Sequence, residues 1–349
     1  MAIMDRKQIM KYLQYIEKNG EPLTEEEMRK YNQILEEIIE NSSLQSFLDK
    51  RFGEIIINYI KDNENIIKES GKKLKRNDDG FVILDGEKFI EREHNGPGIY
   101  AVKWIMVNNT PALIKELDKD NDINTTLISE QIAREAGYEV AEYYPAIFEG
   151  KEVILTPSFL KIKNTPNQKE YFEEEIIQGK KISGSNMDIS ENPKLIRKYF
   201  SERGCSEEKI EELIEKYKSV MLYNIFINLR DGHNGNWGVI QSENNEFRFT
   251  PIFDLEGGLA ENKLNIRPIY IHENYDDESM LRYLLEDKRI REYAKGLLKV
   301  NMDKVYEEVE RNKKVKIPME TRLINSEVIN RSKEKLEEIL VMKENEEVR

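Results

Sequence analysis

The sequence has a single cysteine, Cys205, and only three histidines among its 349 residues. One thiol cannot form a disulfide within the chain, and so few cysteine and histidine side chains leave little for a Cys/His zinc site. A magnesium site built from carboxylate and amide oxygens stays open, because Mg²⁺ prefers oxygen ligands.

The sequence also lacks an excess of basic residues. Lys and Arg number 54 against 67 Asp and Glu, and the formal net charge is −13. Non-specific binding to nucleic acid depends on clustered Lys and Arg that neutralise phosphates. We therefore expect no broad nucleic-acid surface, although a local basic groove is compatible with this composition.

Long hydrophobic runs are missing as well. The longest, residues 220–229, is interrupted by Asn224 and Asn228 and is far shorter than the roughly 20 residues that a membrane helix needs. Residues 1–10 contain charged side chains and no continuous apolar segment, which argues against a secretory signal. We expect a cytoplasmic protein without membrane contact.

Enough apolar material is present for folded domains, since 39% of the residues are hydrophobic and 35% are charged. Three segments differ in pattern. Residues 1–75 predict an N-terminal helical module, in which Thr24 and Glu27 form a capping box. Residues 76–160 predict a β-rich lobe, and residues 161–349 a mostly helical lobe. The charged faces of the N-terminal helices are typical of solvated surfaces; the alternative is that they bind a regulatory partner.

Turn residues divide the β-rich segment. Asp85-Gly86 predicts a hairpin between residues 81–84 and 87–92, and residues 100–107 and 112–117 predict a second one. A single helix is expected at about 124–136, packed against a small sheet, with strands at 139–144 and 153–156.

From about residue 165 the pattern predicts mostly helix. Ser206 is placed to cap a long helix, which ends in a loop rich in Asn and Gly at residues 228–238. Residues 239–240 and 247–250 predict a hairpin that leads to Asp254. Helices are expected again after residue 279 and at about 302–312 and 325–343, with a frayed tail beyond Met342.

The sharpest group of candidate functional residues is Asp231, Asn236 and Asp254. Phosphoryl transfer needs oxygen ligands for Mg²⁺ and a carboxylate that orients or deprotonates the attacking hydroxyl, and these three side chains supply both. The alternative is that Asp and Asn only form turns here, as they often do.

Two further residues fit the same chemistry. Lys115 lies in a strand-like stretch between apolar neighbours, where a lysine is costly unless it meets an anion such as a nucleotide phosphate. Glu130, fifteen residues later on the expected helix, is placed to pair with it. Taken singly, each residue also fits an exposed surface position.

These residues resemble those of a known family. Asp231-Gly-His-Asn-Gly-Asn236-Trp-Gly, followed eighteen residues later by Asp254 in Thr-Pro-Ile-Phe-Asp, resembles the catalytic and metal-binding segments of HipA-like serine/threonine kinases, including the CtkA-like branch. Residues 113–117 and 129–140 resemble the family's lysine strand and glutamate helix. The loop also resembles that of phosphoinositide kinases, a related fold.

The resemblance implies an α+β, two-lobed protein-kinase-like fold that binds ATP and Mg²⁺ between its lobes, with residues 153–159 as the connecting hinge. Asp231 would then be the catalytic base, Asn236 and Asp254 the Mg²⁺ ligands, Lys115 the phosphate anchor and Glu130 its partner. His233 would shape the loop or assist at the phosphate, and both roles stay open.

The sequence departs from the family's pattern in the phosphate loop. The family's serine-bearing, glycine-containing loop is not found, and the nearest substitute is Asn95-Gly96-Pro97-Gly98. Gly96 and Gly98 allow close backbone approach to a phosphate, but the same residues also fit a plain tight turn. The chain begins with helices instead of the family's small β subdomain, so the sequence does not support pairing with an antitoxin.

The leading hypothesis is an ATP- and Mg²⁺-dependent kinase that phosphorylates serine or threonine on a protein. One alternative keeps the ATP site but transfers phosphate to a lipid or small-molecule hydroxyl. The other is a non-catalytic nucleotide-binding scaffold whose N-terminal helices bind a partner.

Overall fold

The computed structural model describes residues 76–77, 80–84, 88–89, 102–107, 110–116, 123–167, 170–184, 188–229, 233–259 and 277–347. The chain divides into two compact units, Met1–Lys73 and Leu74–Arg349, and every described residue belongs to the second. The predicted helices of residues 1–75 lie outside the described residues. No helix within the described ranges is both long and apolar enough to cross a membrane.

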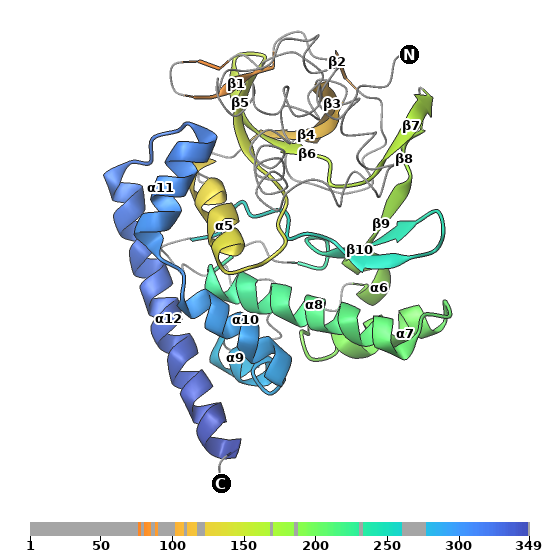
Figure 1. The fold of residues 1–349 in the computed structure, drawn as a ribbon, viewed down its shortest axis with the longest axis vertical. Coiled ribbons are helices and arrows are strands. Elements are labelled where there is room, and N and C mark those ends of the chain that lie inside the picture. Colours follow the sequence, from red (N-terminus) through yellow and green to blue (C-terminus); the bar gives the residue numbers. More distant parts are fainter. Residues whose placement is uncertain are drawn as a thin grey trace, which may run out of the picture. The chain divides into compact units, whose positions relative to one another are not determined.

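A six-stranded sheet, here called the sheet lobe, has the strand order β1-β5-β6-β4-β3-β2 (Figure 1). Neighbouring strands are antiparallel except for the parallel pair β1–β5. The strands are β1 (Val82–Ile83), β2 (Lys88–Phe89), β3 (Val102–Val107), β4 (Thr110–Glu116), β5 (Tyr144–Phe148) and β6 (Lys151–Pro157).

The predicted hairpin across Asp85-Gly86 is wrong, because β1 and β2 lie at opposite edges of the sheet. β1 pairs with β5, and the apolar side chains Val82 and Leu84 are buried in the core of the sheet lobe. The burial of these side chains outweighs a local turn preference. The second predicted hairpin is confirmed as β3–β4. The strand expected at residues 139–144 begins only at Tyr144.

The sequence did not predict three further strands, β7 (Ile162–Asn167), β8 (Glu170–Phe172) and β9 (Glu174–Gln178). β9 pairs with β10 (Gly238–Ser242), which pairs in turn with β11 (Phe247–Phe249), the predicted hairpin. β9 is a strand because its partner arrives some sixty residues later in the chain, so no local signal marks it.

The rest of the described chain is mostly helical. We call these helices, together with β9–β11 and α5 (Ile123–Glu135), the helical lobe. They are α6 (Gly179–Ser183), α7 (Asn192–Ser201), α8 (Glu207–Phe226), α9 (Asp277–Leu284), α10 (Lys288–Leu298), α11 (Met302–Lys313) and α12 (Met319–Glu347). As predicted, Ser206 caps α8, its hydroxyl accepting a hydrogen bond from Lys209 N at 3.3 Å. The prediction of a frayed tail beyond Met342 is wrong for residues 343–347, because α12 continues to Glu347.

Two separate hydrophobic cores underlie the two lobes. Val153 and Leu155 of β6 belong to the core of the sheet lobe, whereas Ile154 between them belongs to the larger core of the helical lobe. This follows from the alternation of side chains along a strand. The same larger core contains the buried face of α5, including Leu127 and Ile132, so α5 packs with the C-terminal helices and not only against the sheet.

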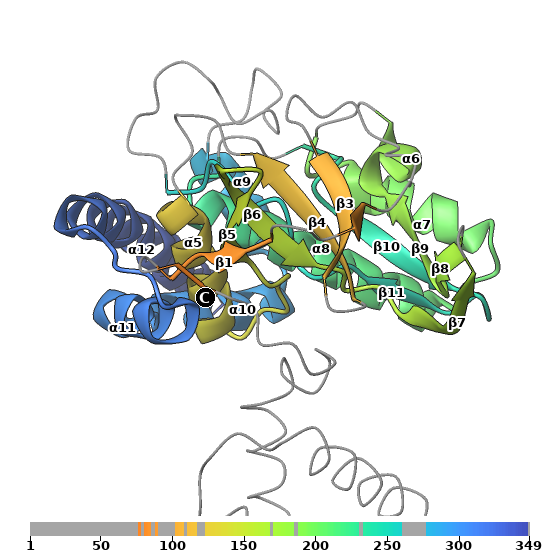
Figure 2. The same ribbon diagram turned by 90° about the horizontal axis from the view of Figure 1, so that it is seen from above.

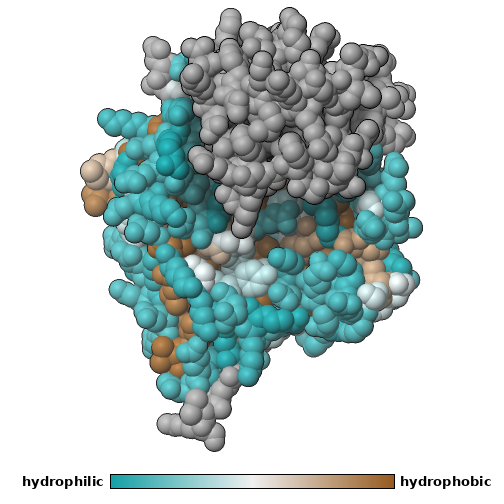
Figure 3. Space-filling view, in the orientation of Figure 1, coloured by the Kyte–Doolittle hydropathy of each residue, from teal (hydrophilic) through white to brown (hydrophobic). Residues whose placement is uncertain are grey.

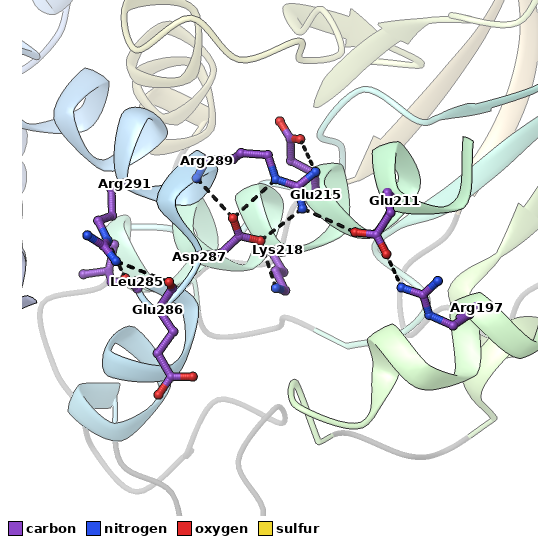
Figure 4. A network of polar contacts seen from close by, with 9 residues as sticks. All are labelled: Arg197, Glu211, Glu215, Lys218, Leu285, Glu286, Asp287, Arg289 and Arg291. Atoms are coloured by element: carbon purple, nitrogen blue, oxygen red, sulfur yellow. Dashed lines mark hydrogen bonds and ion pairs between the residues drawn. The ribbon is translucent and has the colours of Figure 1, made fainter. Parts of the chain in front are cut away.

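The surroundings of α8 and α5 define the helical lobe. In Figure 1, α8 runs beneath β10, with α7 and α10 beside it. Figure 2 shows the same ribbon from above, with α11 and α12 beside α5. Charged residues of α7, α8 and the α10 N-terminus are joined in a polar network centred on Arg289 (Figure 4). The face shown in Figure 3 is mostly hydrophilic, with hydrophobic residues scattered over α12.

Candidate active site

β4 carries Lys115 on the face of the sheet that looks toward the helical lobe. Lys115 is paired in register with Ile154 of β6, and residues paired across neighbouring strands share a face. Ile154 belongs to the larger core, whereas Ile114, the residue before Lys115, belongs to the core of the sheet lobe. Strand alternation therefore directs the Lys115 side chain out of the sheet lobe.

Asp254 reaches the same place from the segment that follows β11. Ile252 is held by two backbone hydrogen bonds, donated by Ile252 N to Glu139 O at 2.9 Å and by Ala141 N to Ile252 O at 2.8 Å. Two residues later, the backbone of Asp254 has a φ of 61°, in the left-handed region that short polar side chains tolerate better than most others. Asp254 thus lies just before the turn of residues 256–259, in which Gly258 N donates to Leu255 O at 3.1 Å.

Lys115 meets two carboxylates at this point. Its Nζ lies 2.5 Å from Asp254 Oδ1 and 3.3 Å from Glu256 Oε2. The Glu256 side chain is only 6% exposed, whereas that of Asp254 is 29% exposed. Asp254 is therefore the carboxylate that a ligand reaches, and Glu256 forms the inner wall of the cluster.

Burial and charge compete in setting the protonation of these groups. Burial, assisted by the nearby Asp254 carboxylate, raises the pKa of Glu256 to about 8. Burial alone would also raise the pKa of Asp254, but the charge of Lys115 and the hydrogen bonds from Glu256 and Lys115 together outweigh it and lower that pKa below its usual value. Burial lowers the pKa of Lys115, but Glu256 and Asp254 together raise it above the usual value. Lys115 is therefore a firmly charged ammonium beside the exposed Asp254 carboxylate.

The loop before β10 supplies His233 and Asn236. Gly235 N donates to His233 Nδ1 at 3.0 Å, and Asn236 N donates to His233 O at 2.8 Å. A Cβ on Gly235 would lie 2.6 Å from His233 Cε1, so the imidazole closes directly over the glycine. This geometry makes His233 a brace of the loop, one of the two roles that the sequence left open.

A buried polar network holds this loop from behind. Asn234 Oδ1 accepts hydrogen bonds from Trp237 Nε1 at 3.1 Å and from Asn192 Nδ2 at 3.3 Å, and Asn192 Nδ2 also donates to Tyr217 Oη at 2.7 Å. A Cβ on Gly179 would lie 2.2 Å from the Trp237 ring, so the start of α6 fits only a glycine there. The loop is thereby anchored to α6, α7 and α8.

The β10–β11 hairpin brings the two parts of the site together. Thr250 N donates to Gly238 O at 3.0 Å, and Gly238 N donates to Thr250 Oγ1 at 3.2 Å. Asn236 stands two residues before Gly238, and Asp254 stands four residues after Thr250. Both candidate ligands therefore leave the same end of one hairpin, although they are eighteen residues apart in sequence.

The predicted pair between Lys115 and Glu130 is wrong. Both carboxylate oxygens of Glu130 lie 3.0 Å from Lys313 Nζ, and Glu130 also accepts hydrogen bonds from Arg134 Nε at 3.0 Å and Tyr143 N at 3.2 Å. The reason is the packing of α5, which turns Glu130 toward α11 within the larger core. Lys313 follows Glu130 by 183 residues, and nothing in the sequence pointed to this pair.

Glu256 is a candidate site residue that sequence reasoning missed. A signal was present: Glu256 is a second carboxylate only two residues after Asp254. Tyr143, also missed, is buried beside the cluster, and its burial and the charges of Glu256 and Asp254 raise the pKa of its phenol. Asp231, Gly96 and Gly98 lie outside the described residues.

Oxygen atoms dominate the donor set for a metal ion. Within the described ranges, no group of three or more His, Cys, Asp or Glu side chains forms a metal cluster. The Asn236 amide and the Asp254 carboxylate nevertheless offer the hard oxygen atoms that suit Mg²⁺. This donor chemistry fits magnesium and excludes a thiolate site.

Neither a protein-family model nor a curated protein sequence matches this chain. Its structure is similar to the Helicobacter pylori proinflammatory kinase CtkA, with a TM-score of 0.53 and 13% identity over 76% of this chain and 99% of CtkA. It is also similar to HipA from the Shewanella oneidensis MR-1 toxin–antitoxin complex of HipA, HipB and operator DNA, with a TM-score of 0.46 and 12% identity over 69% of this chain and 61% of HipA. The likeness to CtkA confirms the predicted α+β, kinase-like fold with a sheet lobe and a helical lobe.

Proposed function

We propose that this protein is an ATP- and Mg²⁺-dependent kinase that phosphorylates serine or threonine on a protein substrate. The observation that carries the proposal is the meeting of Lys115 and Asp254, at 2.5 Å, from two different lobes and beside the loop that bears Asn236. Phosphoryl transfer needs a fixed cation for the phosphates and oxygen ligands for a metal at adjoining positions. The kinase-like fold shared with CtkA supports the same reading.

Lys115 is the proposed phosphate anchor. Its ammonium is mostly buried and stays charged, and a cation held in partly dry surroundings binds phosphate oxygens more strongly than one in water. Its strand is bonded on both sides within the sheet lobe, so the ammonium is held in place before a ligand arrives.

Asn236 and Asp254 are the proposed magnesium ligands. Asn236 is buried in the braced loop, and Asp254 is the more exposed carboxylate of the cluster. When bound, the metal ion would neutralise part of the charge that develops on the transferred phosphoryl group.

Asp231 is the proposed base that orients the acceptor hydroxyl, five residues before Asn236 in the same loop. His233 keeps its Nδ1 on Gly235 N, so its proposed contribution is to fix the path of this loop. The acidic composition supports a protein acceptor over an anionic lipid surface. Three points stay predictions: a cytoplasmic location, phosphate binding at Gly96 and Gly98, and a regulatory partner for the N-terminal helices.

The test is transfer of the radiolabelled γ-phosphate of ATP, with Mg²⁺, to a generic protein acceptor. We expect Asp254→Asn to reduce the rate at least a hundredfold, because the variant loses a charged metal ligand while side-chain size is kept. Acid hydrolysis of the labelled product should yield phosphoserine or phosphothreonine.

Glu116→Gln is the matched control. Glu116 lies on the same strand as Lys115 and pairs with Lys151 at the surface, so its loss should leave the rate within twofold of wild type. A wild-type rate in the Asp254→Asn variant would contradict the assignment. Label on phosphoinositide and none on protein would favour a lipid kinase, and ATP binding without transfer would favour the scaffold.

A further inference from the structure

In the proposed reaction, Lys115 would share its ion-pair partner Asp254 with the metal ion. Asp254 Oδ1 lies 2.5 Å from Lys115 Nζ, yet the proposed function assigns this carboxylate to the metal ion. A carboxylate that coordinates a metal has less charge available for a neighbouring ammonium. A mostly buried lysine needs another oxygen partner to keep its position, because a buried charge without polar partners is costly.

Glu256 is placed to be that partner. Its Oε2 lies 3.3 Å from Lys115 Nζ, and its side chain is more deeply buried than that of Asp254. Two described carboxylates thus lie within 4 Å of the ammonium, and Glu256 is the one that solvent scarcely reaches. The inner position suits a permanent contact with the lysine, and the outer position suits a ligand-binding group.

The backbone around Glu256 is firmly anchored. Leu255 is fully buried, and Leu259 N donates to Ile227 O, at the end of α8, at 2.7 Å. A Cβ on Gly258 would lie 2.9 Å from Ser129 Oγ and 3.0 Å from Ile227 Cδ1, so the turn packs closely against both α5 and α8. The carboxylate of Glu256 is therefore held on a rigid base, as a positioning group must be.

The acidic residue of α5 is already engaged elsewhere. Glu130 bonds Lys313, Arg134 and Tyr143 N, which together satisfy both of its oxygens. Moving it to Lys115 would leave the buried Lys313 ammonium without its carboxylate, and that costs free energy. The helix therefore does not supply the counter-ion of the anchor lysine in this chain.

We propose that Glu256, from the turn after Asp254, is the positioning residue for Lys115 and takes the role that the sequence predicted for Glu130. This inference rests on the proposed function. Glu256 acts through the lysine: it holds the ammonium toward the nucleotide phosphates while Asp254 faces the metal ion.

A double-mutant cycle tests the proposal. Lys115→Met, Glu256→Gln and the double variant are compared for the Kd of ATP with Mg²⁺ by isothermal titration calorimetry, and for KM and kcat in the transfer assay where transfer persists. We expect Glu256→Gln to raise Kd and KM for ATP roughly tenfold, with a smaller change in kcat, as for the loss of one charge-assisted contact. In the Lys115→Met background, the same change should alter Kd less than twofold, because its effect passes through the lysine.

Glu256→Asp keeps a carboxyl group on a shorter side chain and should restore part of the affinity that Glu256→Gln loses. If Glu256→Gln fails to fold, Glu256→Asp takes its place in the cycle. We then expect a smaller rise in Kd, which should again disappear in the Lys115→Met background. The control is Glu130→Gln combined with Lys313→Met, which removes the other buried pair together and should leave Kd within twofold of wild type.

Three results would overturn the inference alone: an unchanged Kd in Glu256→Gln, an equal loss with and without Lys115, or a tenfold loss in the Glu130→Gln/Lys313→Met control. A wild-type protein that neither binds ATP nor transfers phosphate would overturn the proposed function, and this inference with it. The wild-type measurement therefore separates the two failures.

Discussion

The left-handed backbone of Asp254 lies at the centre of the site. A non-glycine residue with φ of 61° persists only where its surroundings impose that conformation, and here the flanking chain is pinned on both sides. Before it, Ile252 bonds the 139–141 segment; after it, Leu259 bonds Ile227. The strain is thus held by contacts outside the site, and the carboxylates of Asp254 and Glu256 both reach Lys115.

Asp287 shows how a single carboxylate links two helices. It caps α10 by accepting a hydrogen bond from Arg289 N at 3.1 Å, and Lys218 Nζ of α8 lies 3.1 Å from its Oδ2 (Figure 4). Burial alone would raise the pKa of Asp287, but the hydrogen bonds from Arg289 and Lys218 outweigh it and lower that pKa.

We predict that Asp287→Asn lowers the free energy of unfolding by about 1 to 2 kcal/mol at pH 7, because the amide keeps the cap but loses the charge. A carboxyl group with a depressed folded-state pKa stabilises the protein above its unfolded pKa of about 3.9 and loses this effect as the pH falls through the folded value. Urea unfolding from pH 7 to pH 3 should therefore show the two proteins converging below about pH 4. A difference that does not change with pH would contradict this role.

At the scale of elements, α5 connects the parts of the helical lobe. One face lies in the larger core, and its buried Glu130 binds Lys313 at the end of α11. Lys313 Nζ also lies 4.4 Å from the centre of the Tyr144 ring at the start of β5, so this single ammonium contacts both α5 and the sheet lobe.

We predict that Lys313→Met lowers the free energy of unfolding by about 2 to 3 kcal/mol, because it leaves a buried carboxylate with only the partly exposed Arg134 as a cationic partner. Adding Glu130→Gln should recover most of this loss, since the amide needs no counter-ion and still accepts a hydrogen bond from Tyr143 N. Chemical unfolding of the three proteins measures both effects. Additive losses in the double variant would show that the pair is not coupled.

At the scale of the whole described unit, two hydrophobic cores are joined across β4 and β6. β6 contributes side chains to both cores, and on the adjoining strand β4 Lys115 forms ion pairs with the turn of the helical lobe. A ligand that binds Lys115 and Asp254 together would contact both lobes and stabilise their junction.

We predict that ATP with Mg²⁺ raises the melting temperature of the full chain. At a ligand concentration 100 times Kd, binding stabilises the folded state by about 2.7 kcal/mol, which corresponds to roughly 5 °C for a unit of this size. Differential scanning calorimetry should show this shift in wild type and in Lys151→Met, whose lysine lies on the neighbouring strand β6 at the surface, but not in Lys115→Met. An equal shift in the Lys115→Met variant would place the nucleotide elsewhere.

The sequence by itself determined the features that depend on nearby residues. The α5 helix, the Ser206 cap and the β3–β4 and β10–β11 hairpins follow from short-range patterns. The resemblance carried by the motifs around Lys115, Asn236 and Asp254 implied the α+β kinase-like fold and marked the candidate site. Secondary-structure propensity, helix capping and the spacing within a motif depend on residues close together in the sequence. They can therefore be predicted from a single sequence.

Only the tertiary structure decided the partners of the buried charges and the strand neighbours distant in sequence. β1 pairs with β5 across the sheet, Glu130 binds Lys313, and Glu256 joins Asp254 at Lys115. A buried charge is stabilised by whichever opposite charge the packing of distant elements brings within about 4 Å, and no local pattern encodes that choice. In this chain, the packing of α5 into the larger core turned Glu130 away from the site, while the turn after β11 brought Glu256 into it.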